Sequence, residues 1–65
     1  MKKQEMINEI ITLDWYDIQN EEDPETVEKE YREQLEQLPI EVLKRYIEDD
    51  TVDSTWLYDE YISKL

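Results

Sequence analysis

The chain has 65 residues, of which 19 are Asp or Glu and 7 are Lys or Arg, so its net charge at pH 7 is −12. This length fits one small domain, residues 1–65, and the absence of Cys and His excludes disulfides, thiolate zinc sites and the commonest general base. The negative charge argues against direct binding to nucleic acid. No apolar run approaches the roughly 20 residues of a membrane span, so we expect no membrane insertion and a cytoplasmic location.

The first predicted helix spans residues 4–19. Asp14 and Asp17 project into its apolar arc, where a buried carboxylate without a partner would be costly. Either the helix unwinds near Asp14, or these carboxylates find hydrogen-bond donors at the end of the core. Tyr16 points to the polar side, and we expect Asn20 to end the helix in the left-handed conformation, which Asn tolerates. The apolar arc contains Met6, Ile7, Ile10, Ile11, Leu13, Trp15 and Ile18.

The second predicted helix spans residues 24–37. Asp23 can cap its free backbone N–H groups, and Pro24 suits the first helical position because its missing N–H is not needed there. A narrow apolar stripe follows at helical spacing, made of Val27, Tyr31, Leu35 and Leu38. The other faces carry opposite charges four residues apart: Glu25–Lys29, Glu28–Arg32, Lys29–Glu33 and Arg32–Glu36.

The third predicted helix spans residues 39–49 and starts at Pro39, which cannot continue the preceding helix. Its apolar stripe consists of Ile40, Leu43 and Ile47, with Tyr46 at the edge. Because the connection is short, we expect the second and third helices to be antiparallel neighbours. Opposite charges again stand four apart, in Glu41–Arg45, Lys44–Glu48 and Arg45–Asp49.

The fourth predicted helix spans residues 53–64, with Thr51 or Asp53 as its cap. Trp56 lies off its apolar stripe. The complete pattern predicts an all-α protein, a small up-down bundle of three to four short helices. The stripe contains Leu57, Tyr58, Tyr61, Ile62 and Leu65.

Residues 4–25 and 46–63 contain many acids and no Lys or Arg. In an up-down bundle these two segments would meet at one pole, although acids at helix starts also complement the helix dipole and acidic loops are commonly just solvated. Tyr16 and Trp56 stand beside these acids, and exposed aromatic residues are enriched at binding hot spots; a core position is an equal alternative for Trp56. The predicted partner-binding residues are Asp14, Asp17, Glu21, Glu22, Asp23, Glu48, Asp49, Asp50, Asp53, Trp56, Asp59, Glu60 and Tyr16.

Metal binding and catalysis find little support in the sequence. Positions 1, 3, 5, 7 and 12 of a calcium-loop spacing are matched by Asp49, Thr51, Asp53, Thr55 and Glu60, but Ser54 at position 6 stands where the loop needs Gly. A di-iron carboxylate bundle uses a Glu-x-x-His motif, which is absent. So small a chain also has little room for an active-site pocket. We therefore expect no metal site, no cofactor and no enzymatic activity.

Three segments resemble the N-terminal part of an uncharacterised bacterial domain family. They are Glu5 to Trp15, Asp23 to Thr26 and Leu43 to Asp49, and from the first to the last they span about two thirds of the chain. The family's next segment, which is rich in Gly and carries an Arg and a Cys, is missing here. Because the family has no known function, the resemblance implies no role for any residue.

The sequence predicts a small acidic interaction protein that binds and occludes a basic protein surface. A sharper version is an inhibitor from a phage or mobile element that mimics nucleic acid and blocks a nucleic-acid-binding protein. The alternative is a bacterial regulatory or structural module whose acidity only keeps it in solution. Both a monomer and a small homo-oligomer are compatible with the sequence.

Overall fold

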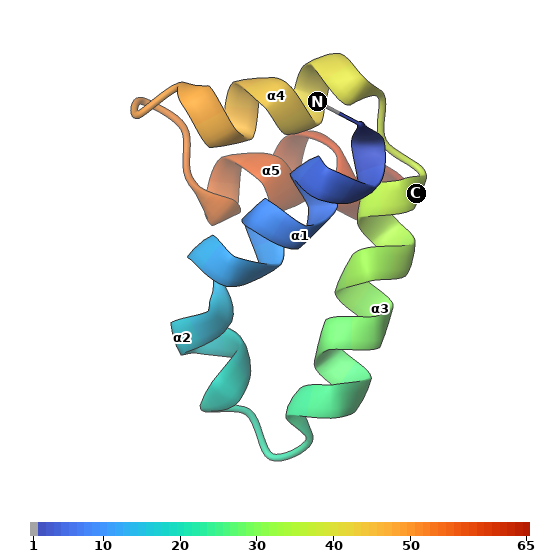
Figure 1. The fold of residues 1–65 in the computed structure, drawn as a ribbon, viewed down its shortest axis with the longest axis vertical. Helices are drawn as coiled ribbons and strands as arrows, with labels where there is room; N and C mark the ends of the chain where they lie inside the picture. Colours follow the sequence, from blue (N-terminus) through green and yellow to red (C-terminus); the bar gives the residue numbers. More distant parts are fainter. Residues whose placement is uncertain (1) are drawn as a thin grey trace.

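The computed structural model describes residues 2–65, which form helices and connecting turns without a strand (Figure 1). The predicted all-α class is confirmed. None of the helices in this part of the chain is long and apolar enough to cross a membrane. The elements are α1 (Lys3–Leu13), α2 (Trp15–Gln19), α3 (Pro24–Glu36), α4 (Ile40–Glu48), α5 (Ser54–Glu60) and the 3-10 helix η1 (Ile62–Lys64).

The single helix predicted for residues 4–19 is wrong, because the chain breaks at Asp14. This residue has φ −96° and ψ 6°, and it ends α1 and precedes α2. Its carboxylate meanwhile accepts hydrogen bonds from two tyrosines of α3 and α4. The helix thus breaks at Asp14, and the Asp14 carboxylate also finds hydrogen-bond donors, so both predicted alternatives occur together. Asn20 does end α2, but in the right-handed region (φ −85°), so the left-handed cap predicted there is also wrong.

Two aspartates start helices as predicted. The Asp23 carboxylate accepts from the backbone N–H of Thr26 at 3.3 Å and from its hydroxyl at 2.7 Å, which caps α3. The Asp53 carboxylate accepts from the backbone N–H of Trp56 at 3.0 Å and caps α5. The helix predicted for residues 53–64 ends early, because Tyr61 (φ −129°, ψ −57°) leaves the α conformation and the chain continues as η1.

Helix α1 is the central element of the fold. It packs against both α3 and α4, while α2 packs against α1 and α3. In Figure 1, α3 runs down one side of the molecule and α4 lies across its upper end, with α5 behind. The antiparallel pairing of α3 with α4, and with it the up-down bundle, is not confirmed, since each of these two helices packs mainly against α1.

The core follows most of the predicted apolar stripes. It is formed by Met6, Ile7, Ile10, Ile11, Ile18, Leu35, Leu38, Val42, Leu43, Leu57 and Ile62.

Several residues predicted in the core are instead exposed. Leu13 and Trp15 flank the break at Asp14 and are 58% and 42% exposed, because the break resets the helical phase. Ile40 is also exposed, whereas Val42, which the predicted stripe omits, is buried. This shows that α4 faces α1 along the side that carries Val42 and Leu43. Tyr58 and Leu65 near the C-terminus are exposed as well.

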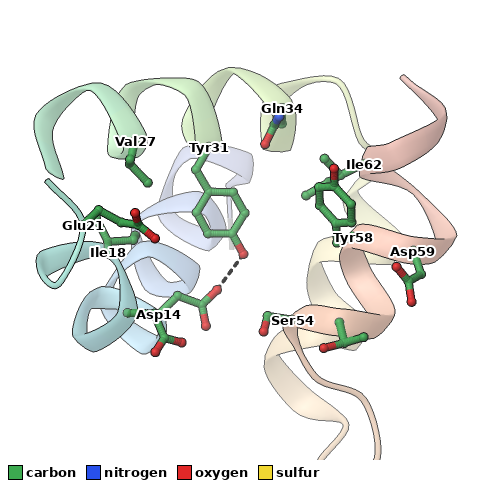
Figure 2. A pocket seen from close by; sticks show the side chains of 12 residues that line it. Asp14, Ile18, Glu21, Val27, Tyr31, Gln34, Ser54, Tyr58, Asp59 and Ile62 are labelled. Carbon is green, nitrogen blue, oxygen red and sulfur yellow. Dashed lines mark hydrogen bonds between the residues drawn. The ribbon is translucent and has the colours of Figure 1, made fainter. Parts of the chain in front are cut away.

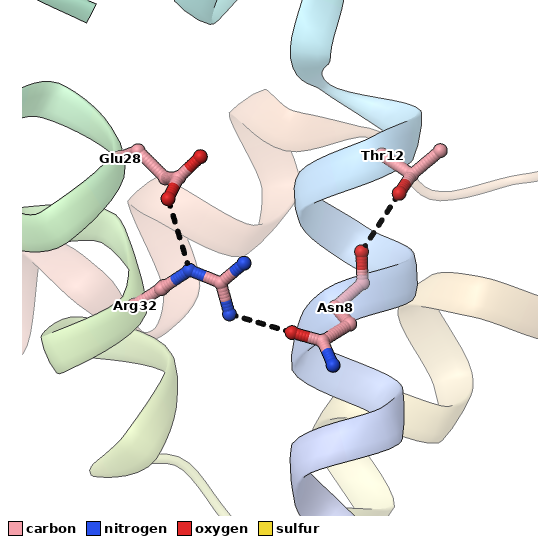
Figure 3. A network of polar contacts seen from close by, with 4 residues as sticks. All are labelled: Asn8, Thr12, Glu28 and Arg32. Atoms are coloured by element: carbon pink, nitrogen blue, oxygen red, sulfur yellow. Dashed lines mark hydrogen bonds and ion pairs between the residues drawn. The ribbon is translucent and has the colours of Figure 1, made fainter. Parts of the chain in front are cut away.

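A polar network joins α1 to α3 on the outside of the core (Figure 3). Arg32 of α3 donates through Nη1 to the side-chain oxygen of Asn8 at 2.6 Å and through Nε to Glu28 at 3.3 Å. Glu28–Arg32 and Arg45–Asp49 are the predicted ion pairs that form within residues 2–65. Both are partly exposed, so each contributes at most a few tenths of a kcal/mol. The Arg32 side chain thus has a structural role, because it links α3 to α1.

Candidate partner-binding site

The candidate site is organised around the carboxylate of Asp14, at the break between α1 and α2. The Tyr31 hydroxyl donates to Asp14 Oδ2 at 2.6 Å, and the Tyr46 hydroxyl lies 2.8 and 2.9 Å from Oδ1 and Oδ2. Burial, followed by the hydrogen bond to Asp14 and the charge of that carboxylate, raises the pKa of both tyrosines well above the usual value of 10.0. Both hydroxyls therefore stay protonated and keep donating at neutral pH.

A cavity of about 530 Å³ opens beside this carboxylate, between α2 and α3 on one side and α5 and η1 on the other. We call it the α3–α5 groove. Figure 2 shows Ile18, Val27 and Tyr31 facing Tyr58 and Ile62 across it. Its polar margin includes Asp14, Asp17, Glu21 and Asp59, together with Gln34, Ser54 and Thr55. No Lys or Arg is among the described residues that line it.

A second, smaller cavity of about 340 Å³ lies on the other side of Asp14. It shares Asp14 and Ser54 with the α3–α5 groove. No Lys or Arg is found among its described lining residues either. The two acid-rich segments thus approach each other on either side of Asp14, although no up-down bundle is established. The second cavity is lined by Leu13, Asp14, Tyr46, Ile47, Asp49, Asp50, Val52, Asp53 and Ser54.

Three of the predicted partner-binding acids also hold the backbone locally. Asp23 and Asp53 cap α3 and α5, and Asp49 Oδ1 accepts from the backbone N–H of Thr51 at 2.9 Å and from its hydroxyl at 2.6 Å. Hydrogen bonds from Thr26 lower the pKa of Asp23, and those from Thr51, with Arg45 as a smaller cause, lower the pKa of Asp49. These acids have a structural reason to be present whether or not they contact a partner.

The remaining predicted residues lie away from the two cavities. Glu22 is exposed in the connection between α2 and α3, and Glu60 is exposed at the end of α5. Glu48 lines a separate cavity of about 400 Å³ that is also lined by Lys44. Tyr16 is exposed as predicted, by 73%, and makes no contribution to the groove.

Trp56 is partly buried and packs against the core. Its ring meets Tyr61 edge-on at a centroid distance of 5.3 Å, and the Arg45 guanidinium lies 5.4 Å from its centroid. Cation–π contacts of this kind contribute about 0.5–1 kcal/mol at exposed sites. The structure thus places Trp56 among residues that hold α5 against the rest of the protein, which corresponds to the core alternative.

Sequence reasoning missed the tyrosines and the neutral residues of the groove. The helical spacing places Tyr31 and Tyr58 on apolar stripes that face the core, so it does not predict either of them as a lining residue. A usable signal was present, because a tyrosine on an apolar stripe needs a partner for its hydroxyl, and Asp14 and Asp17 were carboxylates that needed donors.

The residues with calcium-loop spacing form turns and a helix in the structure. α5 begins at Ser54, so Thr55 and Glu60, at loop positions 7 and 12, lie within a regular helix. The Asp49 and Asp53 carboxylates face the local N–H groups described above. Within residues 2–65, no group of three or more acidic side chains has a geometry that could hold a metal ion.

Comparison of the chain with protein-family models, with curated proteins and with solved structures gave no match. The resemblance to an uncharacterised bacterial domain family therefore stays a prediction, and the function has to be argued from the site itself.

Proposed function

We propose that the protein is a small acidic interaction protein that binds and occludes a basic surface of a partner protein. The observation that carries the proposal is the pair of adjoining cavities around Asp14, which have acidic margins and, among residues 2–65, no basic lining residue. Clefts lined by one sign of charge concentrate the electrostatic field, and this raises the rate at which oppositely charged partners associate. The net charge of −12 acts in the same direction.

The sharper form of the proposal is an inhibitor, from a phage or mobile element, that mimics nucleic acid. Asp17 of α2 and Glu21, just beyond its end, are exposed carboxylates four residues apart. On a helix, Cβ atoms at this spacing lie about 5–6 Å apart, a separation comparable to that of successive phosphates along a strand. A partner that normally binds nucleic acid would then be released from it by competition. The proposed role is binding without catalysis, and the proposed location is the cytoplasm.

An alternative function is supported by the three acids with local structural roles. If Asp23, Asp49 and Asp53 are present because they hold turns, the acidity needs no partner to explain it. The protein would then be a regulatory or structural module that the charge keeps in solution.

Affinity capture from a lysate of the source cells, followed by mass spectrometry, separates the two functions. The first predicts a basic protein that is released by salt and displaced by added nucleic acid if mimicry is correct. A captured partner that is acidic, or whose retention does not depend on salt, would contradict it. The capture is repeated with Glu9→Gln/Glu30→Gln/Glu41→Gln as a control bait. These three acids are exposed and lie outside the cavities, so this variant should still capture the partner.

A further inference from the structure

The α3–α5 groove is an apolar surface with an acidic margin. This combination restricts the kinds of chemical group that the groove can bind. Ile18 and Ile62 are buried residues whose edges line it, and Val27 extends the apolar wall. A purely electrostatic docking surface would need no such wall, because carboxylates on any exposed face attract cations. An occupant must therefore provide apolar contact together with positive charge.

The aromatic rings favour one kind of cation. Tyr58 is 56% exposed and faces Tyr31 across the groove (Figure 2). The Tyr31 hydroxyl is already bound to Asp14, so its ring, not its hydroxyl, is presented to an occupant. A guanidinium group is planar, stacks on aromatic faces and is more weakly hydrated than an ammonium group. Arginine therefore fits the two rings better than lysine does.

The carboxylates complete the match. Asp17, Glu21 and Asp59 are exposed, and none of them is engaged in a side-chain hydrogen bond or ion pair within residues 2–65. They come from α2, from the connection after it and from α5, so they surround the apolar wall from both sides. Arginine–carboxylate pairs are frequently bidentate, which fixes orientation as well as adding binding energy.

We infer that the α3–α5 groove receives an arginine side chain with an adjacent apolar residue, presented by an exposed segment of a partner protein. The apolar residue packs on Ile18, Val27 and Ile62, the guanidinium stacks between the tyrosine rings, and Asp17, Glu21 or Asp59 accepts its N–H groups. The inference rests on the proposed function and specifies the partner feature that the protein recognises.

Two short peptides of equal charge test this inference by NMR titration of the full chain. One alternates leucine with arginine, and the other has serine in place of leucine. The leucine peptide should bind about tenfold more tightly at equal salt concentration, because its apolar side chains are buried in the groove. It should also shift the methyl signals of Ile18, Val27 and Ile62. Replacing arginine by lysine in the leucine peptide should weaken its binding.

Gln34→Trp places a neutral ring in the groove and should remove the preference for the leucine peptide. Gln19→Trp is the matched control, because Gln19 is exposed and lies outside the groove. If Gln34→Trp unfolds the protein, as judged by circular dichroism, the arginine contact is tested instead. Asp17→Asn/Glu21→Gln/Asp59→Asn should then weaken the binding of both peptides clearly more than Glu9→Gln/Glu30→Gln/Glu41→Gln does. The inference is overturned by equal binding of both peptides, by a leucine preference that survives Gln34→Trp in the folded protein, or by equal losses of peptide binding in the two triple variants.

These results are separable from those that test the proposed function. Salt-dependent capture of a basic protein whose affinity Gln34→Trp leaves unchanged would overturn the groove inference and leave the proposed function standing. A clear preference for the leucine peptide, without any basic protein captured from the lysate, would support the groove and contradict the proposed function.

Discussion

The hydroxyl of Tyr46 lies 2.8 Å from one carboxylate oxygen of Asp14 and 2.9 Å from the other, across 32 residues of sequence. This contact links the break after α1 to the last turns of α4. Tyr31 donates to the same carboxylate from α3, so one carboxylate ties three helices together. A core this small stabilises the fold by only a few kcal/mol, so a single polar link of this kind is a sizeable part of the total.

Tyr46→Phe should lower the free energy of unfolding by about 1–2 kcal/mol, because it removes a partly buried hydrogen bond to a charged group. Urea unfolding followed by circular dichroism measures the change. Tyr16→Phe is the control, and it should stay within about 0.5 kcal/mol because that side chain is exposed. In a double-mutant cycle with Asp14→Ala, which removes the acceptor, the two changes should be clearly non-additive. Additive effects would mean that the contact does not stabilise the fold.

Alkaline pH should unfold the protein. The pKa values of Tyr31 and Tyr46 are raised in the folded state, first by burial and then by Asp14. A raised pKa contributes stability that is fully present below the unfolded value of about 10 and is lost progressively as the pH rises above it. Circular dichroism and tyrosinate absorbance, followed together through this range, should show these two partly buried tyrosines ionising only as the helices are lost.

The control for this titration is the double variant Tyr31→Phe/Tyr46→Phe. It should be less stable at neutral pH, but its stability should depend less on pH above about 10. Ionisation of all five tyrosines with the helical signal unchanged would contradict the raised pKa values.

Asp53→Ala should destabilise the protein by about 0.5–2 kcal/mol, since it removes the side chain that caps α5. Asp50→Ala should have almost no effect, because Asp50 is exposed and holds no turn of this kind. Thermal unfolding by circular dichroism compares the two. Similar losses from both would show that the capping contact is unimportant. Charge reversal at Asp49 or Asp53 would not be a clean test of partner binding, because both carboxylates also hold the local backbone.

Leu43→Ala should cost about 2–4 kcal/mol, because Leu43 is completely buried where α4 meets the core. Ile40→Ala, three residues earlier on the same helix, should cost much less because Ile40 is 44% exposed. Denaturant unfolding of both variants measures the difference. If the order were reversed, α4 would be rotated from its position in this structure.

Most of the helices could be predicted from local signals. Asp23 and Pro24 mark the start of α3 through capping and a fixed φ, and Leu35, Leu38 and Leu43 fall on stripes with the helical period. These signals act within a few residues, so the sequence displays them directly.

The parts that could not be predicted depend on contacts between distant residues. The break at Asp14 is stabilised by Tyr31 and Tyr46, and no rule of helical periodicity reveals those partners. Once the break exists, Leu13 and Trp15 leave the core, so one long-range contact changes several local assignments. The same holds for the groove, whose walls come from α2, α3, α5 and η1.

The central claim is that the acids beside the α3–α5 groove bind a basic partner. Its most direct test is the affinity of the captured partner, measured by isothermal titration at several salt concentrations, for two variants with the same net charge. Asp17→Asn/Glu21→Gln/Asp59→Asn should bind at least about tenfold more weakly than the unmodified protein and with a smaller salt dependence, because the charges in contact are lost. Glu9→Gln/Glu30→Gln/Glu41→Gln should bind almost as tightly as the unmodified protein. Equal losses in the two variants would contradict the account, because only the total charge would then matter.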